Sequence, residues 1–206
     1  MKPLQVGITG GIGAGKTIIA RIFSLLGIPV YDADFNAKWL MSNDKMLIME
    51  IINLFGEEAY YPDGSLNREL ISNRAFHSKD LIKSLNSIVH PAVRNHYHEW
   101  VEKNTDSPYL LKEAAILFES KAHKELDKVI TVSAPAEVRI ERTLARDATR
   151  TREQVLAIME KQMPEEEKIL LADYVIFNDN SQLIIPQVLA IDSAIKAQKP
   201  SKNPSI

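Results

Sequence analysis

The 206-residue sequence contains no cysteine, which excludes disulfide bonds, thiolate catalysis and cysteine-ligated zinc sites. No apolar run approaches the ~18 residues that a membrane-spanning helix needs, and no basic stretch followed by an apolar one opens the chain. The formal net charge is only −2, so there is no overall attraction to nucleic acid or to anionic membranes. We therefore expect a cytoplasmic protein that binds neither.

The clearest pattern in the chain is a phosphate loop, G-x-x-x-x-G-K-[ST], at residues 10–17. A short β-branched run at residues 4–9 precedes it, and residues 17–26 follow with apolar side chains at helical spacing. A glycine-rich turn that only links a strand to a helix would not explain Lys16 and Thr17 at the helix start. The spacing also differs from a dinucleotide-binding loop, because Lys16 stands where the third glycine belongs.

This pattern predicts a site for a nucleotide polyphosphate. Backbone N–H groups of the loop and the positive end of the helix dipole suit phosphate oxygens. Lys16 is expected to reach the β- and γ-phosphates, and the Thr17 hydroxyl is expected to ligate Mg²⁺. The predicted nucleotide-binding residues are Gly11, Ile12, Gly13, Ala14, Gly15, Lys16 and Thr17.

The rest of the chain alternates apolar runs with helical periodicity, which predicts an α/β fold with a parallel sheet covered on both faces. We expect one domain over residues 1–206. Further strands are expected at 28–32, within 109–118, at 128–133 and at 174–177, and helices at 134–147, 151–162 and 182–197. Residues 36–104 are mostly helical around a polar turn at 61–65, and they exceed what one crossover needs. They predict an inserted helical lobe that binds substrate.

Two carboxylates, Asp32 and Asp34, follow the second predicted strand, at the sheet edge where ligands of parallel sheets bind. A kinase with an alcohol acceptor can use such a carboxylate to receive or orient the hydroxyl proton, whereas a phosphate acceptor needs none. Asp34 is therefore the candidate base. The alternative is that Asp34 only caps a helix beginning near Phe35.

Four arginines recur at helical spacing near the end of the chain: Arg139, Arg142, Arg146 and Arg150. Such a cationic stripe suits a mobile lid, predicted at residues 140–165, that offsets charge in the transition state. Arg142 and Arg146 fit this role best. The alternative is a solvated helix whose arginines pair with nearby acidic residues.

The helical lobe offers further cations to an anionic substrate. Arg68 follows the polar turn, and Arg94 lies one turn after His90-Pro91, which is expected to begin a helix. From spacing alone the His90-Pro91 pair is more often structural than functional.

The phosphate loop does not by itself distinguish a kinase from a nucleotide switch. A guanine-binding switch should carry Asn-Lys-x-Asp late in the chain, and Asn178-Asp179-Asn180 is only a faint echo of it. A kinase for nucleosides or nucleotides and a nucleotide-dependent binding module both stay open at this point.

Several motifs taken together resemble those of the dephospho-CoA kinase family. The resemblance spans nearly the whole chain, through residues 8–16, 27–34, 63–68, 70–76, His90-Pro91, 117–119, 142–147, Gln162, 172–176 and Asn178. Ala14, Thr17 and Ala115 depart from residues common in the family, and residues 148–162 match loosely. Thr17 keeps the hydroxyl.

The resemblance implies a three-layer phosphate-loop kinase fold with a five-stranded parallel sheet, a helical CoA-binding lobe and a lid. It implies MgATP as donor and the ribose 3′-hydroxyl of dephospho-CoA as acceptor, in the last step of coenzyme A biosynthesis. We expect a monomer or small homo-oligomer. The residues expected to be catalytic are Lys16, Asp34, Arg142 and Arg146, and those expected to bind the acceptor are Asp34, Arg68 and His90.

Overall fold

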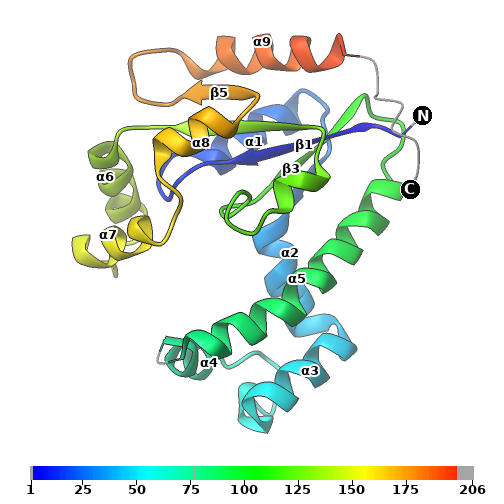
Figure 1. Ribbon diagram of the computed structural model, residues 1–206, viewed down its shortest axis with the longest axis vertical. Helices are drawn as coiled ribbons and strands as arrows, with labels where there is room; N and C mark the ends of the chain where they lie inside the picture. Colours follow the sequence, from blue (N-terminus) through cyan, green and yellow to red (C-terminus); the bar gives the residue numbers. More distant parts are fainter. Residues whose placement is uncertain (1, 77, 199–206) are drawn as a thin grey trace. The chain divides into compact units, whose positions relative to one another are not determined.

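The computed structural model, which describes residues 2–76 and 78–198, contains a five-stranded parallel β-sheet (Figure 1). The spatial order is β2-β3-β1-β4-β5, and every neighbouring pair is parallel. The strands are β1 (Leu4–Thr9), β2 (Val30–Asp32), β3 (Tyr109–Glu113), β4 (Lys128–Ser133) and β5 (Tyr174–Phe177). The predicted α/β fold with a five-stranded parallel sheet is confirmed.

Helices connect these strands, as right-handed crossovers between parallel strands require. The α-helices are α1 (Lys16–Leu25), α2 (Ala33–Asn43), α3 (Lys45–Phe55), α4 (Arg68–Phe76), α5 (Lys79–Glu102), α6 (Ala136–Arg146), α7 (Arg152–Glu160), α8 (Glu165–Leu171) and α9 (Ile184–Lys196). Two short 3₁₀ helices cover Glu57–Ala59 and Ala122–Glu125.

The chain divides into two compact units, which are described separately. The first is built from the segments up to Asp32 and from Asn104 onward, and the second is Ala33–Lys103. The predicted lobe, residues 36–104, overlaps the second unit.

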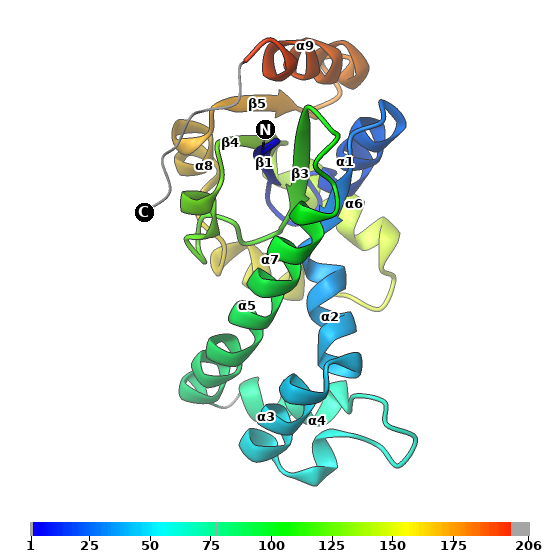
Figure 2. The same cartoon turned by 90° about the vertical axis from the view of Figure 1, so that its right-hand side faces the viewer.

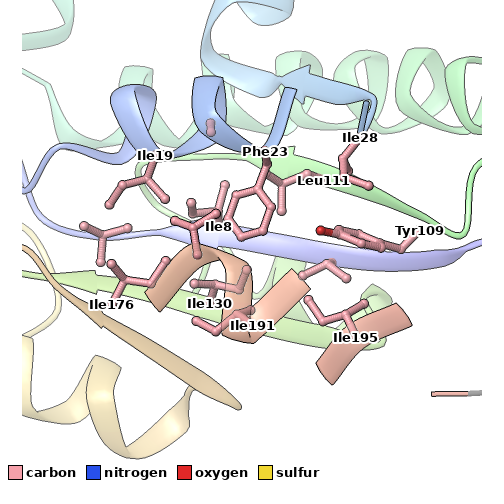
Figure 3. Close-up of a cluster of buried hydrophobic side chains, with 14 of the residues drawn as sticks. Ile8, Ile19, Phe23, Ile28, Tyr109, Leu111, Ile130, Ile176, Ile191 and Ile195 are labelled. Carbon is pink, nitrogen blue, oxygen red and sulfur yellow. The ribbon is translucent and has the colours of Figure 1, made fainter. Parts of the chain in front are cut away.

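In the first unit, α1 and α9 cover one face of the sheet (Figure 3). Phe23 of α1 meets Tyr109 of β3 edge to face, with ring centroids 6.5 Å apart. Alternate residues of β4 point into this layer, and the residue between them, Thr131, points to the opposite face. There its hydroxyl contacts the Lys168 carbonyl of α8 at 3.4 Å. Both faces are thus buried, which explains the nearly continuous apolar strands.

The second unit has a helical core of its own. On α3, Leu47, Ile51 and Phe55 recur every four residues and are buried, and Asp44 caps the helix by accepting from Leu47 N–H at 3.0 Å. Figure 2 shows α2 alongside α5, with α3 and α4 at one end of the pair. The predicted polar turn at 61–65 is confirmed, because Tyr60 and Leu66 form an antiparallel bridge across it.

Two local predictions differ from the structure. Pro91 lies inside the 24-residue α5, so the prediction that His90-Pro91 begins a helix is wrong. A proline removes one internal hydrogen bond, and packing of the long helix against α2, α3 and α4 outweighs that loss. Helix α8 was not predicted, since its first turn is three consecutive glutamates without an apolar period.

Candidate active site

The phosphate loop connects the buried strand β1 to helix α1. Gly13 and Gly15 have φ angles of 76° and 95°, which residues with a Cβ rarely adopt. No side chain caps the first turn of α1. Because the first four N–H groups of any helix lack partners inside it, this turn offers donors to an anion.

Two other amides of the loop are already bonded within the protein. Ala14 N–H donates to the Gly11 carbonyl at 3.1 Å, and Ile12 N–H donates to Gln162 Oε1 at 2.9 Å. The first turn of α1 is therefore the part of this segment where helix geometry leaves N–H groups without partners inside the helix. Ile12 and Ala14 shape the loop in this structure.

The two side chains with predicted roles at the end of the loop have defined contacts. Lys16 Nζ donates to the Gly10 carbonyl at 3.1 Å, which folds the ammonium back over the loop. Thr17 Oγ1 donates to Glu113 Oε1 at 2.7 Å. Glu113 ends β3 and is 6 % exposed.

Glu113 was not predicted as a site residue. It pairs in register with Asp32 at the end of β2, so two carboxylates stand at the carboxyl edge beside the phosphate loop. Burial and the Asp32 charge raise the pKa of the neighbouring Tyr31, so its phenol stays neutral. An acidic residue at the end of the predicted strand, two positions after the apolar Tyr109-Leu110-Leu111, was the available signal in the sequence.

Asp34 is the second residue of α2 and is exposed. The helix begins at Ala33 rather than near Phe35, so the alternative that Asp34 is the N-cap of this helix is wrong. Its carboxylate sits in the first turn, where the helix dipole stabilises negative charge.

The predicted arginine stripe does not form one continuous surface. Helix α6 ends at Arg146, so Arg150 lies beyond it and pairs with Asp147 at 2.7 Å. Arg139 is 8 % exposed and pairs with Glu165 at 3.5 Å. It is therefore neither a lid residue nor a solvated one.

Arg142 and Arg146 differ sharply in their surroundings. Arg142 donates to the Asn178 carbonyl at 2.9 Å and to Asn180 Oδ1 at 3.0 Å. Asn178 Nδ2 in turn donates to the Ala14 carbonyl at 2.7 Å, so Arg142 is linked to the phosphate loop through Asn178. Arg146 is exposed and makes no side-chain hydrogen bond or ion pair with residues 2–76 or 78–198.

The predicted acceptor residues Arg68 and His90 lie in the second unit, and both are exposed. Arg68 begins α4. Partial burial of the imidazole lowers the pKa of His90 below its ordinary value, which favours the neutral form.

A pocket of about 390 Å³ lies within the second unit, among α2, α3 and α5. Its lining includes apolar residues such as Leu40 and Leu47 and three carboxylates, those of Asp44, Glu50 and Glu99. These charges oppose binding of phosphate groups there. Among the described residues, no group of three or more acidic or histidine side chains is arranged to hold a metal, and no helix could span a membrane.

The chain was compared with known protein families and structures. The family model described as dephospho-CoA kinase matches residues 4–183. A dephospho-CoA kinase of Bacteroides fragilis is 36% identical over 188 residues, which cover 91% of each chain.

Two solved structures are similar over most of the chain. A crystal structure from Thermus thermophilus has a TM-score of 0.85 and 34% identity, and the match covers 94% of this chain and 98% of that one. A dephospho-CoA kinase from Campylobacter jejuni has a TM-score of 0.69 and 25% identity, with 93% and 96% covered.

Proposed function

This chain belongs to the dephospho-CoA kinase family, and from that membership we propose that its phosphate loop and Asp34 serve the two sides of one phosphoryl transfer. The enzyme transfers the γ-phosphoryl group of ATP to the ribose 3′-hydroxyl of dephospho-CoA, which gives coenzyme A and ADP. This is the last step of coenzyme A biosynthesis. A cytoplasmic location and a monomer or small homo-oligomer stay predictions from the sequence.

The donor side of the proposal rests on the loop and the first turn of α1. The N–H groups there and the Lys16 ammonium would hold the triphosphate. The contact between the Thr17 hydroxyl and the Glu113 carboxylate, 2.7 Å long, carries this assignment. Both groups offer the hard oxygen ligands that Mg²⁺ prefers. Thr17 and Glu113 would hold Mg²⁺, which would supply positive charge that offsets the charge of the phosphates.

The acceptor side of the proposal rests on Asp34. The 3′-oxygen forms its bond to the γ-phosphorus, the bond to the bridging oxygen breaks, and ADP leaves. The proton of the hydroxyl passes to the Asp34 carboxylate or is oriented by it. An exposed first-turn carboxylate is accessible to a sugar hydroxyl. Arg68 and His90 would bind other parts of the acceptor.

For the lid we propose unequal roles for the two arginines. Arg146, exposed at the end of α6, would contact the transferring phosphoryl group. Arg142 would also support the loop, through its hydrogen bonds to Asn178 and Asn180. Within the predicted lid, residues 140–165, the exposed part around Arg146 would move over the nucleotide, while the turn at Gln162 stays bonded to the loop.

The test is Asp34→Asn, assayed by mass for one phosphate gained on dephospho-CoA, beside a panel of nucleosides and monophosphates. We expect kcat to fall by about 10²- to 10⁴-fold, the usual range for losing a general base. The dissociation constant of ATP should stay unchanged, because phosphate contacts are kept.

Glu69→Gln is the matched control, since Glu69 is also an exposed carboxylate at the second position of a helix in the same unit. It should turn over like the parent. If Asp34→Asn also turned over like the parent, Asp34 would be neither base nor orienting group. Phosphate gained on a nucleoside instead of dephospho-CoA would contradict the assigned acceptor.

A further inference from the structure

The turn between α7 and α8 contacts the middle of the phosphate loop. Gln162, in this turn, is half-buried and its Oε1 accepts from Ile12 N–H at 2.9 Å. The two residues are 150 positions apart in the chain. This bond therefore joins the loop to a turn that lies much later in the sequence.

Arg139 reinforces the same contact from α6. A Cβ added to Gly11 would lie 1.8 Å from Arg139 Nη1 and 3.5 Å from Gln162 Oε1, so Arg139 closely approaches the loop at Gly11 and Gln162 lies beside it. The Arg139 and Glu165 side chains are only 10% and 13% exposed, and they pair at 3.5 Å. Glu165, the first residue of α8, thus holds the Arg139 guanidinium in position.

The turn that carries Gln162 is itself anchored. Met163 N–H donates to Glu119 Oε1 at 2.9 Å, and the same oxygen lies 3.3 Å from Lys168 Nζ. Anchoring the next residue limits the backbone freedom of Gln162. The side-chain amide of Gln162 can therefore bond Ile12 N–H at a small cost in conformational entropy.

The loop needs such an external bond because Ile12 N–H lies outside the helix start. Its hydrogen bond is to Gln162, whereas the donors that suit a phosphate belong to the first turn of α1. A positioned amide at Ile12 fixes the loop's path without removing a donor from that turn.

We propose that Gln162 is a positioning residue for ATP binding. By accepting a hydrogen bond from Ile12 N–H, Gln162 holds the phosphate loop in its binding geometry. The ion pair of Arg139 and Glu165 supports this contact at the neighbouring Gly11. This inference rests on the proposed role of the loop as the ATP site. Gln162 does not itself contact the reacting atoms in this assignment.

The test compares Gln162→Met, Gln162→Glu and a matched control, Gln187→Met. Gln187 also accepts a backbone N–H at 2.9 Å, from Phe177, away from the loop residues that Gln162 contacts. The measurements are the dissociation constant of ATP without acceptor, kcat and KM for both substrates, the thermal midpoint, and hydrogen exchange of the Ile12 amide.

Gln162→Met should raise the dissociation constant and KM of ATP about three- to tenfold, the size expected for one lost neutral hydrogen bond. The KM of dephospho-CoA should not change, and exchange at Ile12 should accelerate. Gln162→Glu keeps an acceptor oxygen and should restore protection at Ile12. Gln187→Met removes three hydrogen bonds, two with the Phe177 backbone and one to the Leu183 carbonyl. It should lower the thermal midpoint at least as much as Gln162→Met does but leave the KM of ATP unchanged.

An unchanged ATP dissociation constant in Gln162→Met would overturn the proposal, and so would an equal rise in Gln187→Met. Loss of Ile12 protection in both Gln162 variants would also contradict it, because the acceptor would then not matter. A parent that binds ATP but transfers no phosphate contradicts the proposed function instead, and the binding measurement separates the two failures.

Discussion

The buried ion pair between Lys168 and Glu119 leads to an asymmetric stability prediction. Lys168 of α8 is 0% exposed, whereas the Glu119 side chain is 20% exposed, and Nζ lies 3.3 Å from Oε1. Lys168 Nζ makes no hydrogen bond with the described residues. Glu119 Oε1 keeps a second partner, the Met163 N–H at 2.9 Å. The lysine therefore depends on this pair more than the glutamate does.

Removing one partner of a buried pair generally costs about 3–5 kcal/mol, because the other charge stays buried without compensation. Glu119→Gln leaves the fully buried ammonium alone, so we expect the upper part of that range. Lys168→Met leaves a carboxylate whose Oε1 is still hydrogen-bonded to Met163 N–H although its Oε2 is buried, so we expect a smaller loss, about 3 kcal/mol. The double variant removes both charges and keeps an acceptor for Met163, so its stability should lie within about 1 kcal/mol of the parent.

The assay is urea unfolding of the parent, both single variants and the double variant at pH 7, analysed as a double-mutant cycle. The expected coupling energy is large and opposite in sign to the summed single losses. Equal losses in the two single variants would refute the argument that the second partner of Glu119 makes it less dependent on the pair. Losses that simply add in the double variant would refute the pair itself.

Two further predictions concern residues that contact the phosphate loop. Asn178→Ala removes the amide donor of a buried carbonyl, that of Ala14, and should cost about 1–3 kcal/mol in urea unfolding while raising the KM of ATP. Asn43→Ala is its control, because it removes the amide donor of an exposed carbonyl, that of Trp39, and it should do neither. Thr17→Val removes the hydroxyl that donates to Glu113 and should lower kcat about 10- to 150-fold. Thr17→Ser keeps the hydroxyl, and its kcat should stay near that of the parent. The measurement is kcat as a function of Mg²⁺ concentration. Equal activity of the two Thr17 variants would rule out a role for this hydroxyl.

The sheet could be predicted from the sequence because its strands are covered on both faces. Such strands are short continuous apolar runs, and 4–9, 128–133 and 174–177 match the observed strands residue for residue. The phosphate loop was predictable for a related reason, since its glycine positions and its Lys-Thr pair are fixed by local backbone geometry. Each of these patterns can be recognised from fewer than ten consecutive residues.

What could not be predicted depends on partners far along the chain. Helical spacing groups Arg139 with Arg142, but only the fold brings Glu165 beside the first and Asn178 beside the second. Periodicity gives the face of a helix and says nothing about what that face meets. Glu113 was missed for the same reason, because its significance depends on Thr17, 96 residues earlier.

These distant contacts act on one object, the segment from Gly10 to Thr17. Gln162 bonds the amide of Ile12, Asn178 bonds the carbonyl of Ala14, and Glu113 accepts from the hydroxyl of Thr17. Each contact uses a polar group that lies outside the set of N–H donors at the start of α1. A loop held at three points loses little conformational entropy when an anion binds, so more of the binding free energy is available to position the γ-phosphate. The motif supplies the donors, and contacts from the second half of the chain hold them in place.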